Sequence, residues 1–170
     1  MNNIILIGFM GTGKTTLGNL LAGHLGIPFY DSDSLIEETS GMKISEIFDR
    51  FGEEGFRRLE TTTLETLSDG GPFVLATGGG IVEKHENHEI LQRMGTVVWL
   101  DATPGKLWSR IKKDGTRPLA TDLSAFSKLY YKRKPLYSGV ASIVIDTEHI
   151  NEEQTFNTAL EKINGKTSDN

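Results

Sequence analysis

Two patterns of apolar and polar positions alternate along this chain, and they predict buried strands and amphipathic helices in turn. Short apolar runs, typical of strands covered on both faces, occur at residues 4–7, 29–31, 73–77, 96–100 and 142–146. Between them apolar residues recur every three or four positions, as on one face of a helix, over 14–25, 34–67, 83–93, 103–112, 123–132 and from 151 on. The alternation predicts an α/β fold with three layers, α/β/α, in which the middle layer is a five-stranded parallel sheet.

Length and local breaks indicate one domain. At 170 residues the chain is long enough to bury one full core. Breaks near Gly41 and near Gly52 are expected to interrupt the long helical stretch over 34–67. We expect the domain to span residues 1–164, because residues 165–170 are polar and typical of a disordered tail.

Composition and charge exclude several classes of function. The chain has no cysteine, which excludes a disulfide framework and a thiolate metal site. No apolar run approaches the ~20 residues of a membrane span, so we expect no membrane partner and a cytoplasmic location. A net charge of -5 argues against nucleic acid as a partner.

The segment between the first strand and the first helix, Gly8–Thr15, reads G-x-x-x-x-G-K-T. This spacing is typical of a phosphate-binding loop, in which glycines let backbone N–H groups turn toward a polyphosphate. Lys14 would reach the β- and γ-phosphates, and the Thr15 hydroxyl would contact Mg²⁺. A glycine-rich turn without a ligand is the alternative, but the strand before the loop and the helix after it favour the phosphate site.

Two carboxylates follow the second strand, in Asp31-Ser32-Asp33. If this segment is extended, residues two apart project to one side, and both carboxylates face one cleft. One would support Mg²⁺ through its waters, and the other would accept a hydrogen bond from a substrate hydroxyl. The alternative is that Asp33 caps a helix that begins at Ser34.

Arg57 and Glu60 are three residues apart and therefore share one face of a predicted helix. Glu60 could hold the guanidinium so that it presents its fork to an anion. The alternative is a solvated ion pair, which we favour for Arg58 with Glu54. Downstream, Gly78-Gly79-Gly80 ends a buried strand, so its backbone and the phosphate loop are expected to border one crevice.

Two basic segments lie in the C-terminal half. The polar stretch around Arg117 is typical of a lid that closes over a nucleotide and excludes water. The triplet Lys132-Arg133-Lys134 follows a predicted helix, and a solvated helix end is its simplest interpretation.

Six motifs in this order resemble those of the shikimate kinases, small P-loop kinases of aromatic amino acid biosynthesis. The resemblance spans residues 3–164 and rests on Gly8–Thr15, Asp31-x-Asp33, Phe56-Arg57-x-x-Glu60, Gly78–Gly80, Arg117-Pro118-Leu119 and Arg133-x-Pro135-Leu136-Tyr137. It implies that ATP and shikimate give ADP and shikimate 3-phosphate, with Mg²⁺ as the cofactor. It also implies a sheet order of 2-3-1-4-5 and a monomer whose partners are small-molecule substrates.

The resemblance implies a role for each site residue. The ATP-binding residues would be Gly11, Thr12, Gly13, Lys14, Thr15, Thr16, Arg110 and Arg117. The shikimate-binding residues would be Asp33, Arg57, Gly79, Gly80 and Arg133, with Glu60 orienting Arg57. Thr15 and Asp31 would serve the metal, and Lys14, Asp33 and Arg117 would be catalytic. A helical region over about 33–62 would bind the substrate, and about 112–122 would form the lid.

One position departs from the family pattern. Family members commonly carry a proline after the last strand, opposite the residue that corresponds to Arg110, and Glu152 stands there in this chain. The closest alternative function is a gluconate kinase, which also phosphorylates a hydroxylated carboxylate. A guanine-nucleotide switch is disfavoured, because the fifth strand ends in Asp146-Thr147 without an N-K-x-D motif.

Overall fold

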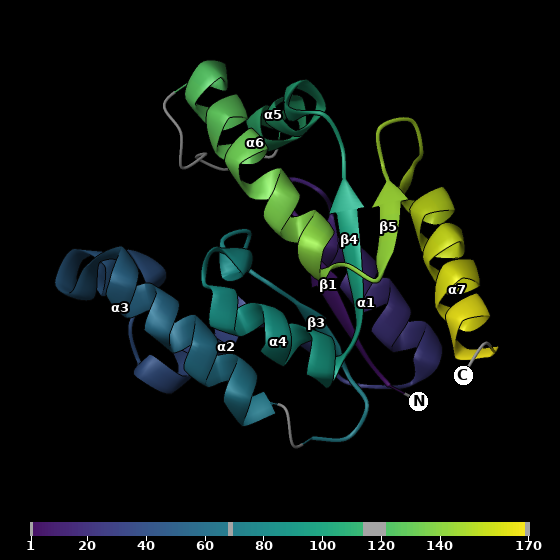
Figure 1. Ribbon diagram of the computed structural model, residues 1–170, viewed down its shortest axis with the longest axis horizontal. Helices are drawn as coiled ribbons and strands as arrows, with labels where there is room; N and C mark the ends of the chain where they lie inside the picture. Colours follow the sequence, from purple (N-terminus) through teal and green to yellow (C-terminus); the bar gives the residue numbers. More distant parts are fainter. Residues whose placement is uncertain (1, 68–69, 114–121, 169–170) are drawn as a thin grey trace.

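The structure, a computed structural model, describes the chain except residues 1, 68–69, 114–121 and 169–170 (Figure 1). Its strands form a single five-stranded sheet in the order β2-β3-β1-β4-β5, and each neighbouring pair is parallel. The strands are β1 (Asn3–Ile7), β2 (Phe29–Asp31), β3 (Val74–Ala76), β4 (Gly95–Asp101) and β5 (Ile143–Asp146). The predicted fold class and sheet order are therefore confirmed.

Helices cover both faces of the sheet, and further helices lie beside it on one side (Figure 1). They are α1 (Lys14–Leu25), α2 (Ser32–Ser40), α3 (Ile44–Leu67), α4 (His85–Met94), α5 (Pro104–Lys113), α6 (Leu123–Val140) and α7 (Glu152–Ser168), with a 3-10 turn η1 (Ile81–Glu83). In the described residues no helix is both long and apolar enough to cross a membrane.

Strand β1 is apolar on both sides because it divides two cores. Ile5 and Ile7 belong to the core under α4 and α6, together with Leu91 and Tyr137. Since side chains alternate along a strand, the residues between them point to the opposite face. The continuous apolar run in the sequence therefore reflects burial on two sides.

The opposite face is covered by α1 and α7. Ile4 and Leu6 pack there with Leu17 and Leu21 of α1 and with Ala159 of α7. This packing places the start of α1, and so the glycine loop before it, at the carboxyl end of β1.

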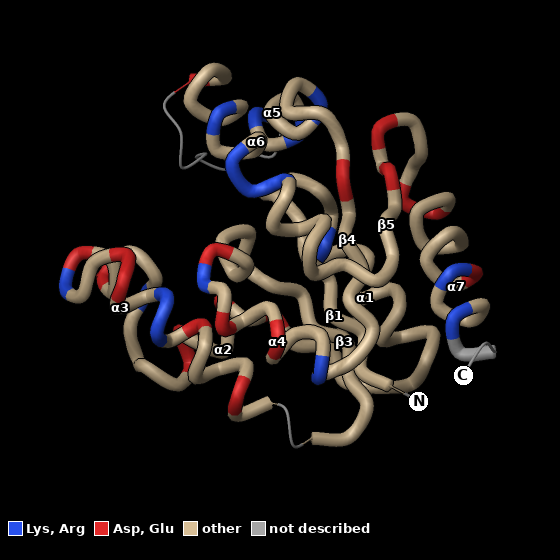
Figure 2. The backbone as a smooth tube through the Cα atoms, in the orientation of Figure 1, with Lys and Arg blue, Asp and Glu red and all other residues tan. Residues whose placement is uncertain are grey.

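A third, smaller core joins α2 to α3, beside the sheet (Figure 1). Its buried residues are Ile36, Ile47 and Phe56. Gly52, with φ 66° and ψ −174°, breaks α3 into two helical segments, close to the break expected from the sequence. The second segment carries Arg57 and Glu60, and acidic and basic residues lie along α3 (Figure 2).

Three predicted boundaries are wrong. Helix α2 begins at Ser32 and its N-cap is Asp31, so Asp33 lies in the first turn and is not the cap. Helix α7 continues to Ser168, into the segment expected to be a tail. A 3-10 turn and α4 replace the single helix expected over 83–93, with Lys84 extended between them.

Helix α6 also continues well beyond the predicted end at 132. It passes through Pro135 and ends at Val140. A proline inside a helix costs about 3 kcal/mol. Burial of Tyr130, Tyr137 and Val140 against the sheet offsets this cost, because full burial of a large apolar side chain contributes about 1.5–3 kcal/mol.

Candidate active site

The phosphate loop takes its shape from glycines with positive φ angles. Gly8, Gly11 and Gly13 have φ angles of 142°, 80° and 90°, a region that residues with a Cβ rarely adopt. A Cβ added to Gly8 would also lie 2.4 Å from the backbone oxygen of Leu100. The loop is therefore held tightly against β4, with α1 beginning directly after it.

Lys14 lies folded back into this loop. Its Nζ donates to the backbone oxygens of Gly8 at 2.8 Å and Phe9 at 2.9 Å. Burial lowers the pKa of Lys14 to about 8, although the charges of Asp33 and Asp31 oppose this shift. The ammonium is held by neutral carbonyls, which an anionic ligand can replace.

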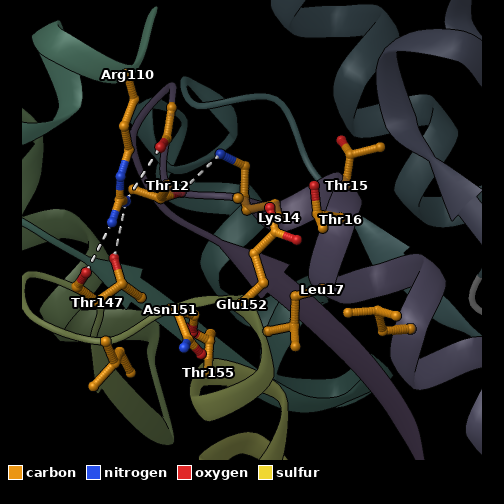
Figure 3. A pocket seen from close by; sticks show the side chains of 14 residues that line it. Thr12, Lys14, Thr15, Thr16, Leu17, Arg110, Thr147, Asn151, Glu152 and Thr155 are labelled. Carbon is orange, nitrogen blue, oxygen red and sulfur yellow. Dashed lines mark hydrogen bonds between the residues drawn. The ribbon is translucent and has the colours of Figure 1, made fainter.

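A pocket of about 560 Å³ opens beside the loop, between α1, α5 and the segment that joins β5 to α7 (Figure 3). We call this pocket, with the loop and Lys14, the nucleotide site. Its wall includes the six predicted nucleotide-binding residues of the loop and Arg110, and also Leu17, Leu20, Thr147, Ile150, Asn151, Glu152 and Thr155. Residues far apart in the sequence thus enclose one cavity.

Arg110 is anchored on one wall of this pocket. It donates from Nη2 to the Thr147 backbone oxygen at 2.8 Å and from Nη1 to Thr147 Oγ1 at 3.2 Å (Figure 3). A longer contact of 3.4 Å joins Nη1 to the Gly11 oxygen. The guanidinium therefore links the phosphate loop to the segment after β5.

Thr15 and Asp31 lie side by side at the phosphate end. The Thr15 hydroxyl donates to Asp31 Oδ2 at 3.3 Å, and Asp31 Oδ1 accepts from the backbone N–H groups of Asp33 and Ser34. The expected extended segment is wrong, because Ser32 and Asp33 are already helical. Two hard oxygen groups at this spacing nevertheless fit a Mg²⁺ ion, which prefers such ligands and keeps several of its waters.

Asp33 points away from the helix cap toward the end of β3. Its Oδ1 is buried and has no hydrogen-bond partner among the described residues. Burial, with the nearby charge of Asp31, raises the pKa of Asp33. Lys14 and Arg57 oppose this shift, so both cations lie within electrostatic reach of the carboxylate.

Arg57 is held by one buried and one exposed glutamate. Its Nη1 donates to Glu60 Oε2 at 2.6 Å, and its Nη2 donates to Glu53 Oε1 at 3.1 Å. The Glu60 side chain is 0% exposed, whereas that of Glu53 is 63% exposed. The predicted pairing of Arg57 with Glu60 is confirmed, and the solvated alternative applies instead to Arg58 and Glu54, which are both exposed.

The Arg57–Glu60 pair is incompletely satisfied. Arg57 Nε and Glu60 Oε1 are buried without a hydrogen-bond partner in the described part of the chain. Burial raises the pKa of Glu60 to about 7, against the opposing charge of Arg57. Buried polar atoms of this kind are costly when unpaired, and a ligand can satisfy them.

Arg133 is buried, so its interpretation as part of a solvated helix end is wrong. Its side chain is 4% exposed, and its Nε donates to Glu83 Oε1 at 2.7 Å. Its guanidinium carbon lies 5.7 Å from the ring centre of Phe9, in the phosphate loop. Burial alone would raise the pKa of Glu83, but the hydrogen bonds from Arg133 and Lys132 outweigh it and lower this pKa.

The three glycines after β3 bring the backbone between these charges. A Cβ on Gly78 would lie 2.8 Å from Asp33 Oδ1 and 3.2 Å from Glu60 Oε1. A Cβ on Gly80 would lie 2.3 Å from both terminal nitrogens of Arg57. We call this region the acceptor site: Asp33, Arg57, Glu60, Gly78–Gly80 and Arg133.

The structure brings together all predicted site residues that it describes: Asp31 contacts Thr15, and the others belong to these two neighbouring sites. Arg117 and most of the expected lid lie outside the described residues. Sequence reasoning missed Glu83, which holds Arg133 from 50 positions away. It named Tyr137 in the sixth motif but gave it no role, and in the structure its hydroxyl donates to the Gly79 oxygen. It also missed Glu53, although its spacing of four from Arg57 was a usable signal.

Comparisons with known proteins agree with this arrangement. The family described as "Shikimate kinase" matches residues 10–164. The "Shikimate kinase" of Marinomonas sp. (strain MWYL1) is 43% identical over 166 residues, which cover 95% of this chain and 91% of that protein. The structure is also similar to "Shikimate kinase from Acinetobacter baumannii in complex with shikimate", with a TM-score of 0.90, 38% identity and coverage of 98% and 94% of the two chains.

A gluconokinase from Sinorhizobium meliloti 1021 is a more distant structural neighbour. Its TM-score is 0.68 over 99% of this chain and 94% of that one, but only 15% of the residues are identical. At that identity the likeness shows a common fold and carries no argument about the substrate.

Proposed function

The chain belongs to the shikimate kinase family, and from this premise we propose that it transfers the γ-phosphoryl group of ATP to the 3-hydroxyl of shikimate. The observation that supports this most is the set of unpaired buried atoms in the acceptor site, namely Asp33 Oδ1, Arg57 Nε and Glu60 Oε1. Shikimate carries one carboxylate and three hydroxyls. It therefore supplies an acceptor for the guanidinium groups and donors for the carboxylates.

The two arginines would bind the carboxylate of the substrate. Arg133 donates from Nε to Glu83, and its Nη1 lies 3.7 Å from the position that a Cβ added to Gly79 would take. Arg57 is fixed through Nη1 by buried Glu60, while its Nη2 donates to the exposed Glu53. The substrate carboxylate would replace Glu53 there, because each charge-assisted hydrogen bond contributes about 1.5–3 kcal/mol and an exposed pair only ~0–1 kcal/mol.

Asp33 would bind the reacting hydroxyl and accept its proton. A carboxylate whose pKa is raised by burial holds a proton better than an exposed one, and it lies close enough to Lys14 to shift the lysine pKa. A buried acceptor of this kind excludes analogues without the hydroxyl by as much as ~10⁴–10⁵. The acceptor site would thus select both ends of the substrate.

The nucleotide site would stabilise the transferred group. Lys14 would leave the carbonyls of Gly8 and Phe9 and contact the β- and γ-phosphates as charge moves to the leaving oxygen. Mg²⁺, held by Thr15 and Asp31, would neutralise phosphate charge when bound. We assign Arg117 to the same task from the motif alone.

An ADP-release assay tests this function. Mg²⁺-ATP is offered with shikimate, gluconate or a nucleoside monophosphate, and we expect turnover with shikimate alone. Asp33→Asn keeps the shape of the side chain but removes the base, so kcat should fall by at least about 10²-fold. Turnover with gluconate and not with shikimate would replace the proposal with the alternative function.

A further inference from the structure

Glu152 is an exposed residue on the wall of the nucleotide site. The phosphate loop with Lys14 and the anchored Arg110 line the pocket together, and Glu152 lines it from the start of α7 (Figure 3). Figure 3 shows the Glu152 side chain directed from the start of α7 toward Lys14. If the phosphates of ATP bind at the loop as proposed above, the ribose follows them into the rest of the pocket, which Glu152 lines.

The backbone that carries Glu152 is fixed from both sides. A reciprocal capping box joins Asn151 and Gln154, with contacts of 3.0 Å and 2.9 Å between the backbone N–H of each and the side chain of the other. Upstream, the Glu148 carboxylate accepts from the backbone N–H and the hydroxyl of Thr103 at 2.7 Å and 3.0 Å. The position of Glu152 is therefore set by the protein before any ligand binds.

The Glu152 carboxylate itself has no partner among the described residues. It forms none of the hydrogen bonds that hold this segment, whereas Thr147, Glu148 and Asn151 all do. An ionised carboxylate only accepts hydrogen bonds. It cannot pair with the phosphates, which are also acceptors and carry the same sign of charge.

The ribose joins the base of a nucleotide to its phosphates, and its hydroxyls can donate hydrogen bonds to a carboxylate. We propose that Glu152 accepts a hydrogen bond from the 2′- or 3′-hydroxyl of the nucleotide, and so makes the enzyme select ribonucleotides over deoxyribonucleotides. This inference rests on the proposed function only in that a nucleotide occupies the pocket. Repulsion of the phosphates by Glu152 lowers overall affinity, so selection is measured by a ratio of affinities.

Equilibrium binding of ADP, 2′-deoxy-ADP, 3′-deoxy-ADP and GDP tests the proposal without any transfer to shikimate. In the unmodified protein at least one deoxy analogue should bind roughly tenfold more weakly than ADP, as expected for loss of a hydrogen bond to a charged group that is partly exposed. In Glu152→Ala this ratio should fall to near one, and Glu152→Gln should give an intermediate ratio. Glu153→Gln, one residue away and outside the pocket, should keep the ratio of the unmodified protein.

Two results would overturn the proposal. One is an unchanged ratio in Glu152→Ala. The other is a change confined to the ratio of ADP to GDP, which would mean that Glu152 contacts the base. Failure of the proposed function looks different: the sugar selectivity would persist and respond to Glu152, while shikimate would not be phosphorylated.

Discussion

The two halves of this active site differ in how they hold charge before a ligand arrives. In the nucleotide site, Lys14 and Arg110 donate to backbone oxygens, and the loop that surrounds them is shaped by glycines. In the acceptor site, Arg57 pairs with Glu60, and Arg133 is held by Glu83 from outside the site. Three buried atoms of Asp33, Arg57 and Glu60 have no partner in the described chain.

The difference shows two ways of preparing a site for an anionic ligand. A phosphate chain bears several charges, so a loop of N–H groups and one lysine can bind it with no fixed counter-ion. A small acid bears one charge and must be gripped in one orientation, which requires guanidinium groups held in place by carboxylates. Because such charges are buried and incompletely paired, the acceptor site costs stability that its ligand can restore.

The largest effect should come from the nucleotide site. Lys14→Ala should lower kcat by about 10²–10³-fold, since the side chain would meet charge that develops during transfer. Shikimate affinity should change little, because Lys14 pairs with carbonyls and lies outside the acceptor site. Steady-state kinetics measures kcat and the KM for shikimate, with the exposed Lys128→Ala as the control. A kcat for Lys14→Ala within a few-fold of the control would show that Lys14 is not catalytic.

A smaller effect, on stability, should come from Glu60. Its pKa is raised from 4.5 to about 7 in the folded protein, so between these pH values the unfolded chain loses a proton that the folded chain keeps. The free energy of unfolding should therefore fall as pH rises through this window. Glu60→Gln should flatten this fall.

Urea unfolding at pH 5 and pH 7.5 measures the change. Glu54→Gln is the matched control, because this glutamate lies on the same helix and pairs with Arg58 in solvent. Asp33 keeps its own contribution in both variants. Equal pH dependence in Glu60→Gln and the unmodified protein would show that the Arg57–Glu60 pair is ionised throughout this range.

The smallest effect should come from Glu53. If the substrate carboxylate replaces Glu53 on Arg57 Nη2, Glu53→Gln should lower the KM for shikimate by about twofold. This factor corresponds to the small free energy that an exposed ion pair at this helix spacing contributes. The kcat and the KM for ATP should not change. A rise in the KM for shikimate would instead mean that Glu53 orients Arg57, as Glu60 does, and the contrast between the two glutamates would be lost.

Local patterns predicted most of the secondary structure. The five strands, the loop Gly8–Thr15 and the break near Gly52 all depend on nearest neighbours in the chain, and the structure agrees. The errors fall where packing overrides local preference. Helix α6 continues through Pro135 because Tyr137 and Val140 are buried beyond it, and this burial depends on residues far away in the sequence.

The sequence by itself determined two groups whose geometry is local: the phosphate loop and the Arg57–Glu60 pair at a spacing of three. It identified Asp31 and Asp33 as candidates, but their helical arrangement came from the structure. Only the tertiary structure decided which charges are buried and what they face. Glu83 reaches Arg133 across 50 positions, and Glu152 reaches the phosphate loop through the packing of α7 on α1. A backbone pattern fixes spacing along one element, whereas burial and pairing depend on how separate elements pack together.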